Sequence, residues 1–431
     1  MKKYLFFWRT LGSTFWFVPT LMLLSSMLLA GGTLYLDFST GIKLPFLNLH
    51  SAEAGREILS VISSAMISVT GTVFSATLVV LTLASSQFGS QLVKNFMYVR
   101  INQVVLGSYI ATFLFGLIIL TTVRSSEDSS FIPTISIGTA ILLAVINVIL
   151  LIFFIHNLAS SIQVNQITAQ IYESTLSNLQ QLYPEKIGKE PKEEEATDLT
   201  RELEKFSFQT DLPAPESGYL QFVDDKGLID LMKENDAVLE LSRRPGDYMI
   251  ESRTIGTIHS KKETEEEFVE KMQGYLVAGN IRTTTQDVEY SVHQIVQVAA
   301  KALSPGVNDP FTAMTCIDYL TGILSYLIRV KFPAAQRFDQ EQNLRLVVKK
   351  FDFEGIFNAA FHKIRQYAVG NTTVIIHLMD AMAALHDMTT DEGYQKIIQS
   401  QAQMILESGK RTIEEKNDLG DLTRRAEGVL K

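Results

Sequence analysis

The stretch Ile58-Leu-Ser-Val-Ile-Ser-Ser-Ala-Met-Ile-Ser-Val-Thr-Gly-Thr-Val-Phe-Ser-Ala-Thr-Leu78 decides the broad fold class of this chain. It contains no Asp, Glu, Lys or Arg. Because a helix needs about 20 apolar residues to cross a bilayer core, the stretch is predicted to span a membrane. Its hydroxyl residues recur at helical spacing beside Gly71, and they are Ser60, Ser64, Ser68, Thr72 and Ser75.

Three further apolar stretches share this character and lie at residues 15–36, 104–123 and 131–155, with the opening stretch extended to 58–84. The first follows Lys2, Lys3 and Arg9, as a signal peptide would, but three more spans favour an uncleaved helix. We therefore predict a mainly α fold that begins with a four-helix transmembrane bundle in residues 1–157.

The charges divide the chain into two unlike parts. Mean hydropathy is +0.14 and net charge −9 over 431 residues. Residues 1–157 hold eight bases and five acids, a net charge of +3, and the remainder holds 30 bases and 42 acids, a net charge of −12. These values exclude a single soluble domain, a disordered chain and a general nucleic-acid binder. Cys316 is the only cysteine, so a disulfide framework is excluded as well.

The basic residues of the short loops predict the orientation. Lys2, Lys3 and Arg9 share one side with Lys94 and Arg100 if there are four spans. This bias places both termini, and the acidic half, in the cytoplasm.

The hydroxyl stripe of the second span has two interpretations. Small residues and hydroxyls allow close helix packing and interhelical hydrogen bonds, which predicts an interhelical seam. The same residues could line a pore at an oligomer axis, although pores usually add charged rings or carbonyl filters. The seam is the favoured interpretation.

The cytoplasmic half is predicted to be an α+β domain, with a small β barrel or sheet and a helical bundle. We expect a helical stalk at 158–184, a linker at 185–216, a β-rich subdomain at 217–260 and a helical subdomain at 261–431. Within the β-rich part, Arg243 and Arg244 precede a Pro-Gly turn. They could hold an anion, but a plain exposed turn is favoured because nothing nearby in the sequence completes a phosphate site.

Residues 281–313 are the most informative stretch of the cytoplasmic half. An apolar helix face begins near Val288 and ends at Ser304-Pro-Gly306, and Asp309 is a natural N-cap before Pro310. The favoured interpretation is a tight interhelical corner. A compatible second interpretation is a polar constellation that binds a ligand, an ion or a partner, formed by Arg282, Gln286, Asp287, His293, Asn308 and Asp309.

No motif indicates catalysis or a resident cofactor. His377, Asp380 and Asp387 have loose spacing that suits a solvated helix better than a metal site. Cys316 lies on an apolar helix face and is interpreted as a core residue. We therefore predict no catalytic residues, no metal site, no cofactor and no enzymatic activity.

Several blocks of the chain resemble one family. They include Ser13 to Pro19, Ser217 to Gln221, Arg244-Pro-Gly-Asp247, Arg282 to Asp287, and above all Ala302-Leu-Ser-Pro-Gly-Val-Asn-Asp-Pro-Phe-Thr-Ala313. They are similar to the bacterial predicted-membrane-protein family catalogued as domain of unknown function 2254. The resemblance covers about Trp8 to His386 and implies a multi-pass protein of the bacterial inner membrane. It supplies no activity.

Two function hypotheses follow. The first is an oligomeric channel-like or transport-related protein, a homo-oligomer in the lipid bilayer whose cytoplasmic half assembles or gates it. The second is a membrane-anchored sensor or scaffold that binds a small ligand, an ion or a partner through the cytoplasmic domain. Neither involves nucleic acid.

Overall fold

The structure is a computed structural model that describes residues 14, 16–40, 51–88, 100–126, 129–161, 164–182 and 199–431. Contacts divide the chain into two compact units, Met1–Gln166 and Ile167–Lys431. The basic residues Lys2, Lys3, Arg9 and Lys94, on which the predicted orientation depends, lie outside the described residues, as does the predicted linker up to residue 198.

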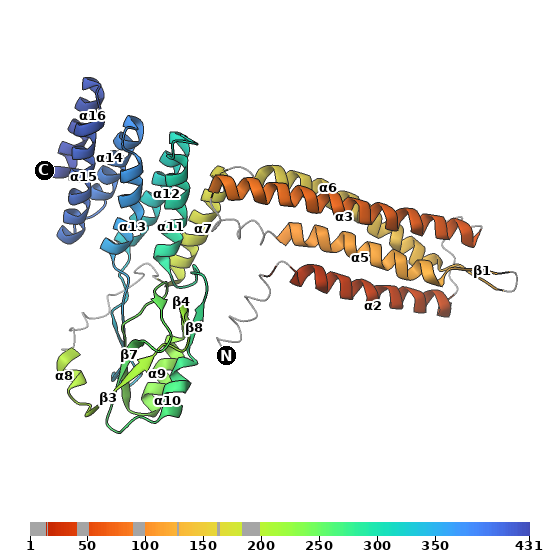
Figure 1. Cartoon of the computed structure of the whole chain (residues 1–431), viewed down its shortest axis with the longest axis horizontal. Coiled ribbons are helices and arrows are strands. Elements are labelled where there is room, and N and C mark those ends of the chain that lie inside the picture. Colours follow the sequence, from red (N-terminus) through yellow and green to blue (C-terminus); the bar gives the residue numbers. More distant parts are fainter. Residues whose placement is uncertain are drawn as a thin grey trace. The chain divides into compact units, whose positions relative to one another are not determined.

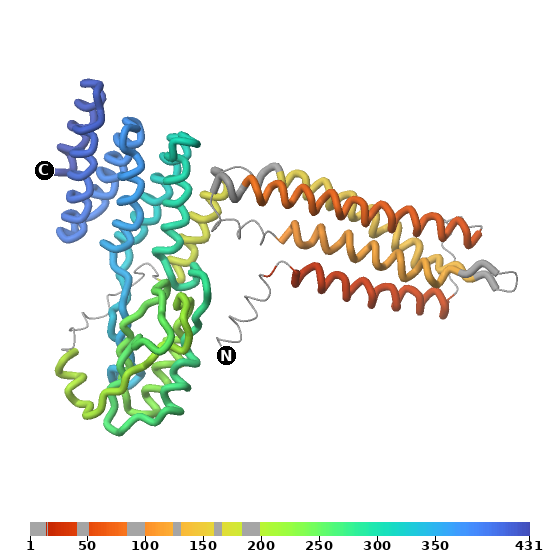
Figure 2. The backbone as a smooth tube through the Cα atoms, in the orientation of Figure 1, coloured from red at the N-terminus to blue at the C-terminus, as the bar shows by residue number. Residues whose placement is uncertain are grey.

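The first unit contains four long apolar helices that lie side by side (Figures 1 and 2). They are α2 (Phe17–Thr40), α3 (Ala52–Phe88), α5 (Arg100–Thr122) and α6 (Thr134–Ser161). A short antiparallel pair, β1 (Arg124–Ser126) and β2 (Ser129–Phe131), joins α5 to α6. α5 contacts the other three helices and is the most buried of the four.

The buried side of this unit is mainly aliphatic and aromatic, with Leu59, Phe115 and Ile119 fully buried. One carboxylate is buried with them. Asp37 near the end of α2 accepts the backbone N–H groups of Ile135 (2.8 Å) and Ser136 (3.0 Å). Asp37 therefore caps the first turn of α6 from a different helix, which satisfies N–H groups that a helix start leaves free.

Five described helices are long and apolar enough to cross a membrane: α2, α3, α5, α6 and α12 (Pro310–Arg329). The apolar residues of α12, such as Ile317 and Leu320, are fully buried within the second unit. The predicted mainly helical fold with a downstream α+β region is confirmed. Four as the number of spans stays a prediction.

Helix α7 (Val164–Leu182) lies mostly in the second unit, within the range predicted as a helical stalk. The ring of Tyr172 in α7 stacks on Tyr319 of α12, with centroids 5.0 Å apart. After α8 (Leu199–Leu203) the chain enters a β-rich region with α9 (Asp225–Glu234) and α10 (Glu266–Gln273).

The strands of this region form two sheets. A five-stranded sheet has the order β3-β7-β5-β10-β9, and a three-stranded sheet has the order β6-β4-β8. The larger sheet is antiparallel except for β5 and β10, which run parallel. The strand bounds are β3 (Phe208–Pro213), β4 (Gly218–Val223), β5 (Ala237–Leu241), β6 (Tyr248–Met249), β7 (Thr254–Ser260), β8 (Leu276–Gly279), β9 (Gln336–Phe338) and β10 (Leu344–Val348).

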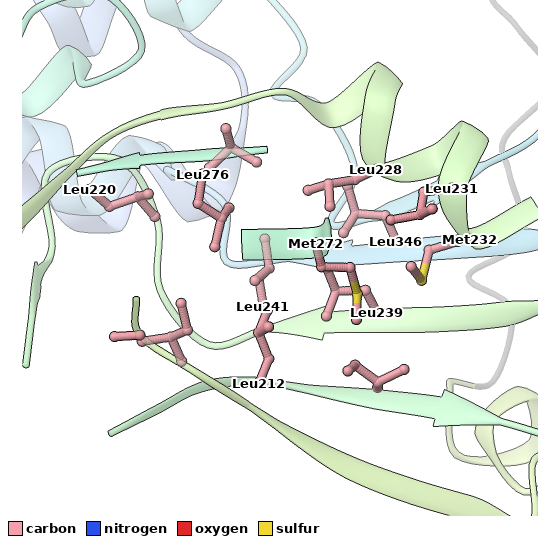
Figure 3. Packing of buried hydrophobic residues seen from close by; sticks show 14 of the residues in the cluster. Leu212, Leu220, Leu228, Leu231, Met232, Leu239, Leu241, Met272, Leu276 and Leu346 are labelled. Carbon is pink, nitrogen blue, oxygen red and sulfur yellow. The ribbon is translucent and has the colours of Figure 1, made fainter. Parts of the chain in front are cut away.

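A leucine- and methionine-rich core holds the two sheets and α9 together (Figure 3). Leu212, Leu239, Leu346 and Met232 are fully buried in it. They come from three strands and one helix, so burial of this apolar surface links segments that are distant in the sequence.

The sheets extend beyond the β-rich subdomain predicted at 217–260. β3 lies in the predicted linker, and β8, β9 and β10 lie in the predicted helical subdomain. β10 reads Leu344-Arg-Leu-Val-Val, a short apolar run that periodicity alone does not distinguish from a buried helix segment. It is buried because it is a central strand with a parallel neighbour.

The remaining helices stack in two layers. α11 (Val288–Ala302), α13 (Phe353–Tyr367) and α15 (Glu392–Thr412) form one layer. α12, α14 (Thr372–Asp387) and α16 (Lys416–Leu430) form the other. The predicted helix start at Asp309-Pro310 is confirmed, with Asp309 as the N-cap of α12.

Candidate functional site

The hydroxyl stripe of α3 faces away from the helices of its own chain. All five of its residues are exposed: Ser60, Ser64, Ser68, Thr72 and Ser75. The residues of α3 that pack inward include Leu59, Met66 and Val73. At 3.6 residues per turn these two sets lie on opposite sides of the helix. The stripe therefore does not pack against the other described helices of its own chain.

The stripe hydroxyls are poorly satisfied within the chain. Thr72 Oγ1 lies 3.4 Å from the carbonyl oxygen of Ser68. The other four hydroxyls donate to no other residue in the part of the chain that the structure describes. A hydroxyl in a bilayer core has no water to bond, so a neighbouring helix is a favourable partner.

A second polar group lies inside the same unit and is fully satisfied. Asn147 of α6 is completely buried. Its Oδ1 accepts from Ser108 Oγ at 2.6 Å, and its Nδ2 donates to Thr112 Oγ1 at 2.7 Å. Tyr109 Oη donates to the Asn147 carbonyl oxygen at 2.8 Å. Sequence reasoning missed this network because it searched the spans for ionisable residues.

In the second unit, four members of the predicted constellation lie together at the start of α11. Arg282 donates to Asp287 through Nε (2.7 Å) and Nη2 (3.0 Å). Asp287 is 1% exposed and accepts the backbone N–H of Tyr290, so it is also the N-cap of α11. Gln286 bonds both the N–H and the carbonyl of Val223 in β4. These side chains join the small sheet to the helical layers.

His293 is the fourth member of this group, and the four residues Arg282, Gln286, Asp287 and His293 are called the joint. Its Nδ1 lies 3.5 Å from Arg282 Nη1. Burial lowers the pKa of His293 below its ordinary value, and the positive charge of Arg282 lowers it further. His293 is therefore a neutral imidazole at pH 7, held against a cation that is already paired.

Asn308 and Asp309 lie at the other end of α11, so the predicted constellation is not one site. The 15 residues of α11 separate them from Asp287 by about 22 Å of helix. Asp309 accepts from the backbone N–H (3.1 Å) and hydroxyl (2.6 Å) of Thr312. Asn308 has a φ of +48°, which suits the tight turn. The corner interpretation therefore accounts for both residues.

A pocket of about 180 Å³ lies beside the joint, at the carboxyl ends of β5 and β10. Its cationic lining residues come from three separate segments and are Arg243, Arg244, Arg337, Lys349 and Lys350. Asp225 is the acidic residue among its lining. Gln286 and Phe351 also contribute to the wall.

Arg244 is fixed in this wall. Its guanidinium carbon lies 4.2 Å from the centroid of the Phe351 ring. Its Nη2 donates to Glu289 Oε1 at 2.6 Å, and its Nη1 donates to the carbonyl oxygen of Lys350 at 3.2 Å. The Arg243-Arg244 turn is therefore not a plain exposed turn, because it is bonded to the end of β10.

The family described as predicted membrane protein (DUF2254) matches residues 12–384. The chain belongs to this family. The uncharacterised proteins Rv1290c of Mycobacterium tuberculosis and Mb1321c of Mycobacterium bovis are each 29% identical over 383 residues, which cover 87% of this chain and 72% of each relative. The protein MT1328 of Mycobacterium tuberculosis is 28% identical over the same length. No solved structure matches the chain.

Two of the sequence blocks that resemble DUF2254 meet at the joint. Gly246, in the Arg244 to Asp247 block, lies so close to Asp287 that an added Cβ would be 2.2 Å from Asp287 Oδ2. Asp287 closes the Arg282 to Asp287 block. The block at 302–313 forms the corner at the far end of α11, where Phe311 is 76% exposed.

Two of the three residues screened for metal spacing, His377 and Asp380, have side-chain partners on other helices. His377 Nε2 lies 2.7 Å from Asp318 Oδ1, and Asp380 pairs with Arg425. Among the described residues of this DUF2254 chain, no group of three or more potential ligands could hold a metal ion.

Proposed function

We propose that the chain forms a homo-oligomer in the membrane, in which the outward faces of α3 from several subunits meet. The observation that carries the proposal is that all five stripe residues are exposed on the face opposite the buried one. Small side chains allow close approach of two helices, and hydroxyls left unpaired in one chain gain partners in a second.

We further propose that this oligomer is channel-like, with α2, α3, α5 and α6 as its spans. Inside one chain, the donor and acceptor atoms of Asn147 are both engaged, so that network offers no free ligand atoms to a passing ion. An axis shared by several α3 helices would supply uncharged hydroxyls instead. In this proposal the second unit is cytoplasmic and assembles or gates the channel.

Cysteine cross-linking tests the oligomer. Cys316 is fully buried, so Ser64→Cys or Ser68→Cys introduces a single accessible thiol. In native membranes, mild oxidation is expected to give a disulfide-linked dimer from these variants. Leu28→Cys, on an 80% exposed residue of α2, is the matched control and should remain monomeric. Equal cross-linking in all three variants, or in none, would contradict the proposed interface.

Planar-bilayer recording of the purified protein tests the channel. Conductance is expected, and Ser64→Leu with Ser68→Leu should reduce it by narrowing the axis and removing hydroxyls. Cross-linking at α3 together with no conductance under any voltage or ionic condition would leave a packing seam and refute the channel.

A further inference from the structure

The pocket beside the Arg282–Asp287 joint suggests a second function, which does not depend on the proposed oligomer. The register of the sheet explains why its cations meet. β5 and β10 are parallel, with Leu241 opposite Val348. The two strands therefore end at the same edge, and the residues that follow, Arg243-Arg244 and Lys349-Lys350, leave the sheet side by side. The crevice beyond the carboxyl ends of parallel strands is a common ligand site in α/β sheets.

The charges of the lining are only partly neutralised. Arg244 pairs with Glu289 at 2.6 Å, and Lys349 lies 3.5 Å from Asp247. Within the described part of the chain, Arg243 and Lys350 have no ion-pair partner, and Arg337 donates only to the carbonyl oxygens of Ala334 and Gln336. With Asp225 counted against these three cations, the pocket has two positive charges in excess.

Apart from the amide of Gln286, the rest of the lining is apolar. It comprises Leu182, Val223, Leu241, Pro245, Pro333, Val348 and Phe351. A volume of about 180 Å³ is slightly larger than a cavity that holds benzene. The pocket thus combines a cationic rim with room for a small apolar or planar body.

We propose that this pocket binds the phosphate monoester group of a small ligand. A phosphate monoester has a charge of about −1.5 to −2 at pH 7, which matches the excess of the lining. Arginine presents a planar fork of donors to phosphate oxygens, and lysine adds a compact charge. The group could belong to a soluble phosphorylated metabolite or to the headgroup of phosphatidic acid, since both present the same dianion.

Binding to the detergent-purified full chain tests the proposal. The soluble probes are inorganic phosphate and adenosine monophosphate, measured by calorimetry, with adenosine as the probe that lacks phosphate. Calorimetry with water-soluble short-chain phosphatidic acid, against short-chain phosphatidylcholine, tests the lipid source, because the apolar helices of the full chain would insert into vesicles of either lipid. We expect binding to at least one of the two monoester probes, adenosine monophosphate and phosphatidic acid. We expect no binding to adenosine or phosphatidylcholine, and weaker binding of the monoester as the salt concentration rises.

Charge reversal identifies the pocket as the site. Arg243→Glu with Lys350→Glu should weaken binding about tenfold or more, because two rim cations become repulsive. Arg253→Glu with Lys396→Glu makes the same change in net charge at exposed positions outside the pocket lining and should leave binding within about twofold. If the double glutamate variant does not fold, Arg243→Gln with Lys350→Gln replaces it.

Three results would overturn the proposal. They are no binding of any monoester probe to the unaltered chain, equal binding to both charge-reversed proteins, and equal binding of adenosine and adenosine monophosphate. None of these results depends on whether the chain forms an oligomer or a channel.

Discussion

Arg282 and Asp287 form a two-point ion pair in which Nε and Nη2 of the guanidinium donate to the carboxylate at 2.7 and 3.0 Å. The same carboxylate caps α11. One acidic side chain therefore both starts a helix and neutralises a partly buried cation, which fixes its position from two directions. Gly246 contacts this carboxylate from the neighbouring turn.

Gly246→Ala is expected to destabilise the protein by about 2 kcal/mol or more. The backbone φ of Gly246 is +97°, a conformation that L side chains rarely adopt. The added Cβ would also lie 2.2 Å from Asp287 Oδ2, and Asp287 cannot move away without losing the cap and the ion pair. Thermal or chemical unfolding of the detergent-purified protein measures the loss.

Gly420→Ala in α16 is the matched control. Nothing lies within 4 Å of its added Cβ, and φ is helical, so alanine should raise stability by up to about 1 kcal/mol. If Gly246→Ala behaved like this control, the tight contact with Asp287 would be wrong.

Local rules predicted the corner at the far end of α11, because its caps depend on neighbouring residues. Asp309 and Pro310 occupy the cap and first-turn positions that their sequence indicates. The pocket was not predictable in this way. Arg337 and Lys350 reach the Arg243 turn only through pairing of β5, β10 and β9, and the sequence gives no local signal for that pairing.

Helical spacing likewise placed the five hydroxyl residues of α3 on one face but could not say what that face contacts. The composition of the stripe, including Ser60 and Ser64, favours a packed seam but does not identify the surface that the stripe packs against. The outcome depends on which side of α3 meets α5, and the longer-range packing of Leu59 and Phe115 decides that.

Acid should remove one stabilising contribution from the second unit. Asp339 accepts from Arg345 Nε (2.8 Å) and from the backbone N–H groups of Glu341 and Asn343 (both 2.9 Å). Burial by itself raises the pKa of Asp339, but these donors outweigh burial and lower the pKa to about 2. The carboxylate is thus more acidic in the folded state than its unfolded value of about 3.9.

The sign of the effect follows from this difference. The contribution of Asp339 to the free energy of unfolding is complete above about pH 5. It is lost as pH falls from about 4 towards 2, because the unfolded chain then binds the proton more tightly. Asp339→Asn should cost about 2 kcal/mol at pH 7, and the gap to the unaltered protein should narrow by pH 3. Unfolding curves at both pH values measure this gap.

Asp230→Asn, at an exposed position of α9, is the control and should show little effect on stability at either pH. A gap for Asp339→Asn that stays constant with pH would contradict the assignment.

Asn147→Leu separates structure from conduction in the first unit. The change removes the acceptor of Ser108 Oγ and the donor to Thr112 Oγ1, both in α5. Interhelical hydrogen bonds in membranes contribute about 1 kcal/mol, so a modest fall in the midpoint of thermal unfolding is expected. Val148→Leu, at an exposed neighbouring position of α6, should leave the midpoint unchanged.

Because Asn147 is fully buried and the α3 stripe is exposed, cross-linking of Ser68→Cys should persist in the Asn147→Leu background. Loss of conductance with no change in the unfolding midpoint would instead place the ion path through the interior of a single chain.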